Sequence, residues 1–233
     1  AEEFGPSLFP LHEVHKITVL DIRLANTDRN AGNILVKKDE KTDKIVSLIP
    51  IDHGYALPHT LEDVCFEWEF WPQAKKPYSQ ETKEYIETLD ADEDIEYLRD
   101  NDIELHSSSE RVLKICTLLL KKCAKLDIPP ADIASIMSRS MPNRMSDVEK
   151  IVAKAASTAI CAVRSERGEL VHKAPKNGSF WNDLDEEGSY AETIFAREYE
   201  KALEKERALH LANVAKVNEA AKTREEASNI AHE

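Results

Sequence analysis

Two short stretches of the sequence carry side chains suited to phosphoryl transfer. The stretch LANTDRNAGNILV holds Asp28 and, five positions later, Asn33. The stretch IPIDHGYALP holds Asp52, two positions before Gly54. Transfer of a phosphoryl group from ATP requires a carboxylate beside the attacking hydroxyl and oxygen ligands for a magnesium ion. These residue types at these spacings can supply both.

Either stretch taken alone would more often be a polar turn, because Asp and Asn are common turn residues. Between them, however, the β-branched runs NILV and KIVSLIPI flank the charged segment KKDEKTDK. This pattern predicts a β-hairpin with a solvated tip. Kinases place the catalytic Asp, the metal-binding Asn and the second metal-binding Asp in the same order along the chain. The combination therefore favours a kinase site over two unrelated turns.

Both stretches resemble the catalytic and metal-binding loops of the phosphatidylinositol 3-/4-kinase superfamily. HKITVLDIRLANTDRNAGNILV is most similar to the type II phosphatidylinositol 4-kinases, whose loop reads N-T-D-R-x-x-x-N. The Asp-His-Gly triplet and FEWEFWPQAKKPYS look most like the plant-type gamma branch of those enzymes. The resemblance covers roughly residues 9–161. It implies an α+β, mostly helical fold, namely a protein-kinase-like C-terminal lobe with one β-hairpin that carries the metal site.

The resemblance also implies roles for single residues. Asp28 would be the catalytic Asp, which accepts or orients the proton of the acceptor hydroxyl, and Arg29 would orient the loop around it. Asn33 and Asp52 would bind the metal ion, and Asp52 with Gly54 would contact the nucleotide. The implied reaction transfers the γ-phosphate of ATP, with Mg²⁺ or Mn²⁺, to the 4-hydroxyl of phosphatidylinositol in membranes. His53, between the two nucleotide contacts, is interpreted as a positioning residue rather than a general base.

The stretch after Asp-His-Gly occupies the place of a kinase activation segment, which holds the phospho-acceptor. Lys75 and Lys76 are candidate substrate-binding residues, acting as point charges on the phosphodiester of the lipid. Trp68 and Trp71 could lie at a membrane interface, but we expect them to pack against the helical lobe. Four acidic residues crowd the same stretch: Glu62, Asp63, Glu67 and Glu69. Because of this negative charge, Ser/Thr protein kinase activity remains an alternative to lipid kinase activity.

A kinase also needs a glycine-rich strand pair over the ATP phosphates and a lysine that pairs with them. Only 27 residues precede Asp28, and they contain one glycine, Gly5, and one lysine, Lys16. We therefore expect this sequence to lack the N-terminal lobe, to bind nucleotide weakly and to turn over poorly alone. An inactive C-lobe remnant that acts through its helical surface is a third hypothesis.

The sequence predicts three parts. Residues 1–168 should form the kinase-like lobe, residues 169–188 a linker rich in Gly, Pro and Asn, and residues 189–233 a charged C-terminal helix. The lobe is expected to consist of four successive regions: the catalytic loop (24–36), Asp-x-Gly (52–54), the activation segment (55–78) and helices (79–168). Three Ser-to-Glu capping boxes indicate helix starts. They are Ser107–Glu110, Ser146–Glu149 and Ser189–Glu192.

Composition limits the other classes of function. A net charge of −13 and a pI near 5.2 argue against a nucleic-acid partner, which requires concentrated Lys and Arg. No apolar run approaches the roughly 20 residues of a membrane helix, and the acidic start does not resemble a signal peptide. We expect a cytoplasmic protein, for which peripheral binding to membranes stays open.

Cysteine and histidine spacings do not indicate zinc sites. The four cysteines include no C-x-x-C pair, so buried reduced thiols are the better interpretation. His12 and His15 stand three apart, whereas the helical zinc motif needs histidines four apart. We expect these two histidines to lie toward solvent or to support a loop.

Overall fold

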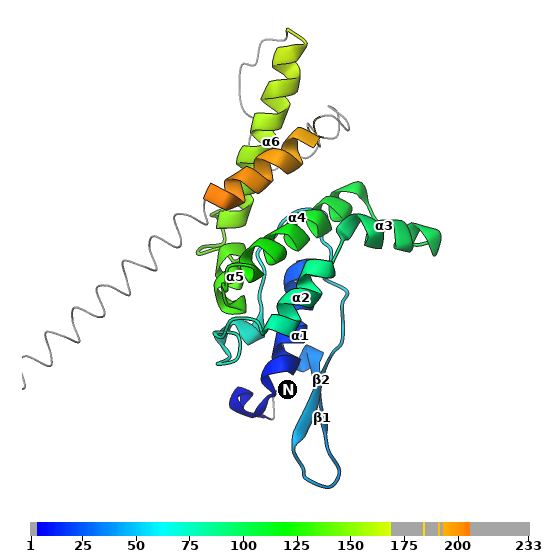
Figure 1. The fold of residues 1–233 in the computed structure, drawn as a ribbon, viewed down its shortest axis with the longest axis vertical. Coiled ribbons are helices and arrows are strands. Elements are labelled where there is room, and N and C mark those ends of the chain that lie inside the picture. The colour runs from blue at the N-terminus through cyan, green and yellow to red at the C-terminus, as the bar shows by residue number, and fades with distance from the viewer. Residues whose placement is uncertain (1–3, 169–183, 185–190, 192, 206–233) are drawn as a thin grey trace, which may run out of the picture. The chain divides into compact units, whose positions relative to one another are not determined.

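The computed structural model describes residues 4–168, 184, 191 and 193–205, and it divides into two compact units, residues 1–150 and 151–233. In chain order its elements are η1 (Pro6–Leu8), α1 (Leu11–Leu24), η2 (Ala31–Asn33), β1 (Ile34–Lys38), β2 (Ile45–Pro50), η3 (Glu67–Phe70), α2 (Gln80–Thr88), α3 (Ala91–Asp100), α4 (Ser107–Ala124), α5 (Pro130–Met137) and α6 (Asp147–Glu166). Figure 1 shows the single hairpin of the described residues projecting beside α1, while the other labelled elements are helices. The prediction of a mostly helical fold with one β-hairpin is confirmed.

Helix α1 is central to the first unit, because it packs on α4, on α5 and on β2. Val14 and Ile17 on its inner face have almost no exposed surface, as expected of apolar residues at helical spacing. The helix ends at Ala25, which adopts a left-handed conformation (φ 46°). The Ala25 N–H donates to the carbonyls of Asp21 and Ile22 in the last turn. This reversal sends the chain out of the helix and into the NTDRNAG loop.

Strands β1 and β2 form the predicted antiparallel hairpin, with Val36 opposite Leu48 and Leu35 opposite Ile49. Leu48 is buried, whereas Leu35 and Ile49 are exposed, so the hairpin rests on the lobe with one face only. At the tip, the Asp39 carboxylate accepts hydrogen bonds from the two backbone N–H groups of residues 41 and 42. The charged turn is therefore a hydrogen-bonded loop exposed to solvent.

A buried carboxylate on α1 holds the hairpin in place. Glu13 has only 5% of its surface exposed, and its Oε2 accepts hydrogen bonds from the Leu48 N–H (2.9 Å) and from the Ser47 hydroxyl (2.7 Å). Its Oε1 accepts one from Lys16 Nζ (2.7 Å). Burial by itself raises the pKa of Glu13, but these hydrogen bonds outweigh burial and lower the pKa to about 2.

The helix starts confirm one predicted capping box and correct another. Ser146 and Glu149 form the reciprocal pair, with Glu149 Oε2 2.7 Å from the Ser146 nitrogen. Helix α4 instead begins one residue earlier than predicted, because the His106 ring accepts the Ser108 N–H and serves as the N-cap. Ser107 is therefore the first residue of the helix and not its cap. The third predicted box, at residues 189 and 192, lies outside the described residues.

Single-residue predictions in the first unit have mixed outcomes. Trp68 and Trp71 pack in the core, and Cys116 and Cys123 are buried free thiols, as predicted. Cys65 is exposed, so the prediction of burial is wrong there. The reason is alternation along an extended segment, because the residues on either side of Cys65 point inward and are buried.

In the second unit, Cys161 is partly exposed, and residues 193–205 are helical. The predicted linker at 169–188, apart from residue 184, lies outside the described residues, as does most of the predicted terminal helix. Within the described ranges, no helix is long and apolar enough to cross a membrane.

The Glu13 contacts predict a specific acid sensitivity. A carboxyl whose pKa falls from 4.5 to about 2 on folding stabilises the protein fully above pH 4.5, and this contribution disappears as the pH falls toward 2. Glu13→Gln should therefore lower the free energy of unfolding by about 2–3 kcal/mol at pH 7. The difference between variant and wild type should shrink between pH 4.5 and pH 2 in urea titrations followed by tryptophan fluorescence.

The matched control is Glu40→Gln at the exposed hairpin tip, which should change the free energy of unfolding by less than about 0.5 kcal/mol at any pH. A Glu13→Gln deficit that stayed constant from pH 7 to pH 2 would show that the hydrogen bonds of Glu13 do not depend on its charge.

Candidate active site

The loop after α1 is fixed by its own asparagine side chains. Asn26 is buried, and its Oδ1 accepts the Asp28 N–H (3.1 Å). The Asn33 amide nitrogen donates to the Asp28 carbonyl (3.1 Å), and Asn30 caps the short helix η2 by accepting the Asn33 N–H (3.2 Å). Both sides of the Asp28 backbone are therefore held by hydrogen bonds. This local bonding explains why the loop is rich in Asn and Asp.

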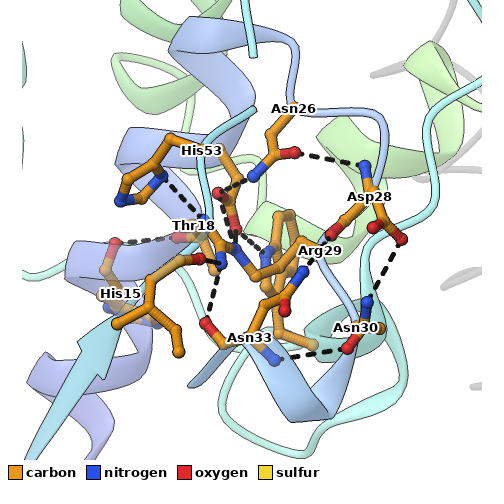
Figure 2. A network of polar contacts seen from close by, with 11 residues as sticks. His15, Thr18, Asn26, Asp28, Arg29, Asn30, Asn33 and His53 are labelled. Atoms are coloured by element: carbon orange, nitrogen blue, oxygen red, sulfur yellow. Dashed lines mark hydrogen bonds and ion pairs between the residues drawn. The ribbon is translucent and has the colours of Figure 1, made fainter. Parts of the chain in front are cut away.

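Asp28 itself is partly exposed. Its Oδ1 accepts a hydrogen bond from Asn30 Nδ2 at 3.2 Å. Figure 2 shows Asp28 beside Asn30 at one edge of the polar network, with His53 at the opposite edge. The structure thus presents a carboxylate at a fixed backbone position that solvent or a substrate can reach.

Arg29 joins the loop to the end of the hairpin. Its guanidinium has no exposed surface, and Nη1 donates to the carbonyls of Asn33 and Ile51, each at 2.8 Å. Nη2 lies 3.1 Å from Nδ1 of His53, which must accept because a guanidinium has no acceptor atom. One buried side chain therefore holds the residues on both sides of Asp52 against the catalytic loop.

The counter-charge for Arg29 comes from Asp21 on α1. Arg29 Nε lies 2.9 Å and 3.0 Å from the two carboxylate oxygens of Asp21, and the Asn26 amide and the Trp68 indole also donate to them. Burial raises the pKa of Asp21, and the charge of Arg29 followed by the hydrogen bonds from Trp68, Asn26 and Arg29 opposes that rise. A buried guanidinium needs this kind of partner, because an unpaired buried charge is strongly destabilising.

Sequence reasoning missed Asp21, although the sequence contains a signal for it. Asp21 stands four positions after Ile17 and seven after Val14, so it belongs to the apolar face of α1. A charged residue on that face needs a buried partner. Helical spacing identifies neither its charge partner Arg29, which follows after the helix has ended, nor Trp68, which lies 47 positions along the chain.

Asp52 lies two residues beyond the end of β2. The Ile51 N–H donates to the Asn33 carbonyl (2.9 Å), which brings the strand end to the catalytic loop. Asp52 is exposed and adopts a left-handed conformation (φ 53°), which Asp tolerates better than most residues. The Gly54 N–H lies 3.4 Å from its Oδ1. Among the described residues, no cluster of three or more His, Cys, Asp and Glu side chains could hold a metal ion.

The activation segment is paired with the catalytic loop through its backbone. The Arg29 N–H donates to the Cys65 carbonyl (3.2 Å), and the Glu67 N–H donates to the Arg29 carbonyl (2.8 Å). These bonds form a parallel bridge between Arg29 and Phe66. Earlier in the segment, the Leu57 N–H donates to the Leu24 carbonyl (2.7 Å). The segment therefore runs alongside the loop that carries Asp28.

Lys75 and Lys76 are exposed in the later part of the segment, and neither takes part in the described network around Arg29. That part is fixed by Gln73, whose carbonyl lies 3.1 Å from the ring nitrogen Nε2 of His15. Burial lowers the pKa of His15. His15 thus supports a loop, and His12 faces solvent, as the sequence predicted for this pair.

The Arg29 network predicts a large cost for a charge-conserving substitution. Arg29→Lys keeps the positive charge beside Asp21 but cannot reach Asn33, Ile51 and His53 at once, because a lysine lacks the planar fork of N–H groups. We expect the free energy of unfolding to fall by about 3 kcal/mol. Urea unfolding at pH 7 measures this change.

Arg144→Lys, at an exposed position, is the matched control and should stay within about 0.5 kcal/mol of wild type. If Arg29→Lys were equally mild, the guanidinium contacts would not be what holds the loop to the hairpin.

Comparison with known proteins finds a family match for most of the first unit. The family model described as phosphatidylinositol 3- and 4-kinase matches residues 1–133. Phosphatidylinositol 4-kinase gamma 4 of Arabidopsis thaliana is 50% identical over 159 residues, which are 68% of this chain and 28% of the relative. Phosphatidylinositol 4-kinase gamma 3 of the same plant is 53% identical over 151 residues, or 65% of this chain and 26% of the relative.

A rice relative, phosphatidylinositol 4-kinase gamma 4 of Oryza sativa subsp. japonica, is 47% identical over 165 residues, which are 71% of this chain and 29% of the relative. The chain thus spans less than a third of the length of these curated relatives. The family match nevertheless covers 133 of its 233 residues, and therefore the chain belongs to the phosphatidylinositol 3- and 4-kinase family.

Proposed function

We propose that this chain is the part of a phosphatidylinositol 4-kinase catalytic domain that carries the catalytic carboxylate and the metal ligands. The observation that carries this proposal is the Arg29 network, which ties the loop from Asp28 to Asn33 to the strand end before Asp52. Phosphoryl transfer requires such groups at one place and in a fixed geometry. Two unrelated polar turns would not need a buried guanidinium that holds them together.

The donor groups fit Mg²⁺ or Mn²⁺ bound with ATP. Magnesium prefers oxygen ligands and is usually held by one or two protein side chains together with phosphate oxygens. Asn33 uses its amide nitrogen within the loop, so its Oδ1 is the atom it can offer to a metal. Asp52 adds an exposed carboxylate. A bound metal ion would neutralise charge on the phosphates.

ATP also needs a surface for its base, and the hairpin offers an apolar one. Leu35, Ile49 and Ile51 are 50%, 44% and 36% exposed. Leu35 and Ile49 are opposite each other in the two strands, and Ile51 directly precedes Asp52. Apolar side chains next to phosphate-binding groups suit a purine ring. This face is consistent with the proposed nucleotide site.

Asp28 is the residue that we assign to the acceptor hydroxyl. Its backbone is held by Asn26 and Asn33, while its carboxylate is partly exposed. A carboxylate so placed can accept a hydrogen bond from the hydroxyl and orient it for attack on the γ-phosphate. Arg29 does not touch substrate in this scheme, because it is fully buried; it acts by holding the loop.

The names of the relatives support phosphatidylinositol as the acceptor, and the choice of its 4-hydroxyl depends on this similarity alone. The exposed Lys75 and Lys76 would contact the anionic headgroup as point charges. The exposed Glu62 and Glu67 in the same segment would instead favour a basic peptide. A Ser/Thr protein acceptor is therefore the second outcome that the assay must distinguish.

The proposal predicts that Asp28→Asn abolishes turnover without unfolding the protein. In the full-length gene product, phosphate transfer from ATP to phosphatidylinositol vesicles should fall about 10³-fold, because the acceptor hydroxyl loses its carboxylate. Radiolabelled ATP with vesicles in one arm and a generic protein acceptor in the other identifies the substrate class. Circular dichroism should show unchanged helix content.

Asp100→Asn, at an exposed position on α3, is the control and should leave the rate unchanged. Full activity of Asp28→Asn would rule out the assignment. Phosphate transfer to the protein acceptor but not to the vesicles would support the assignment of the site and show that its acceptor is a protein and not the lipid.

A related prediction concerns the 233-residue chain on its own. It should transfer phosphate at less than about a hundredth of the full-length rate, because the glycine-rich strands and the lysine that hold ATP are not among its residues. Robust turnover by the purified chain in the same vesicle assay would contradict this expectation.

A further inference from the structure

We infer that Trp68 is a positioning residue: its indole fixes the activation segment against the catalytic loop and thereby sets where the acceptor substrate stands relative to Asp28. The inference rests on the function proposed above and extends it to a residue that cannot touch either substrate. Trp68 has no exposed surface, so any effect it has on the reaction must pass through its neighbours.

The first of these neighbours is Asp21. Trp68 Nε1 donates to Asp21 Oδ2 at 2.9 Å, and the same oxygen lies 2.9 Å from Arg29 Nε. The indole of the activation segment and the guanidinium of the catalytic loop therefore share one carboxylate oxygen. Hydrogen bonds to charged groups in a buried site are stronger than neutral ones, so this contact is a strong link between the two segments.

The second link runs through the backbone and an aromatic pair. Phe66 lies opposite Arg29 in the parallel bridge, and its ring stacks on Trp68 with centroids 4.6 Å apart and planes 13° from parallel. Arg29 directly follows Asp28 in the chain. A displacement of the indole would thus act on the bridge one residue away from the catalytic carboxylate.

The rest of the segment is attached elsewhere. The Trp71 ring packs on Phe9 (centroids 4.9 Å apart), and the Tyr78 hydroxyl lies 2.9 Å from the Thr18 hydroxyl on α1. These contacts hold the later residues to α1 and to the N-terminal segment. Loss of the Trp68 contact should therefore loosen the part of the segment next to Asp28 and leave the later part in place.

A purely structural core tryptophan would lower stability without a selective effect on the acceptor. The two roles can be separated by comparing Trp68→Phe with Trp71→Phe. Both changes replace a buried indole by a smaller ring in the same segment, but Trp68 alone of the two donates to Asp21. The free energies of unfolding of both variants are measured first, so that the kinetic comparison is made under conditions in which both are folded.

In the full-length gene product with phosphatidylinositol vesicles, Trp68→Phe should raise the KM for phosphatidylinositol about tenfold, with the KM for ATP within twofold of wild type. Trp71→Phe should leave both KM values within twofold. Equal changes of the acceptor KM in the two variants, or an equal rise of the ATP KM, would overturn the inference.

Amide hydrogen exchange on this 233-residue chain provides a readout that does not depend on activity. In Trp68→Phe, the Arg29 and Glu67 amides of the parallel bridge should exchange at least tenfold faster than in Trp71→Phe. If the full-length wild type had no kinase activity but this exchange pattern appeared, the proposed function would fail and the link would stand. If the exchange rates were equal, the link would fail whatever the activity.

Discussion

A guanidinium with no exposed surface must have a counter-charge and acceptors for its N–H groups, and the shape of this site follows from how Arg29 meets that requirement. The counter-charge is Asp21 on α1, and the acceptors are backbone carbonyls of the catalytic loop and of the hairpin end, together with His53. These partners belong to three segments, namely α1, the loop after it and the end of the hairpin. Satisfying one buried charge therefore forces three segments of the chain to meet at one place.

Helix α1 is the element on which this arrangement depends. It carries two buried carboxylates: Asp21 near its C-terminus receives the loop and the activation segment, and Glu13 near its N-terminus receives β2. A two-stranded hairpin is marginally stable alone, so the Glu13 contacts help to fix the strand that leads to Asp52. Polar residues on the inner face of one helix thus position both halves of the candidate site.

Features that depend on local sequence could be predicted, and features that depend on distant partners could not. The hairpin and the Ser146–Glu149 capping box both follow from residue patterns within a few positions. Glu13 meets β2 across 35 positions and Asp21 meets Trp68 across 47, and spacing gives no information about such pairs. The misplaced N-cap at α4 is a local failure, because a histidine ring took a role that Ser more often fills.

The same residue type serves opposite purposes in this site, and burial decides which. Asp21 is fully enclosed, and its carboxylate accepts hydrogen bonds from Arg29, Asn26 and Trp68, so its capacity is spent on the protein itself. Asp28 is held through its own backbone, and Asp52 is held through its neighbours Ile51 and His53. The Asp28 side chain is partly exposed and the Asp52 side chain is exposed. Acceptor capacity that the fold leaves unused is what a metal ion or a hydroxyl can bind. Under the proposed function, the groups that set the geometry are not the groups that would meet the substrate, so the site would keep its geometry before any substrate arrives.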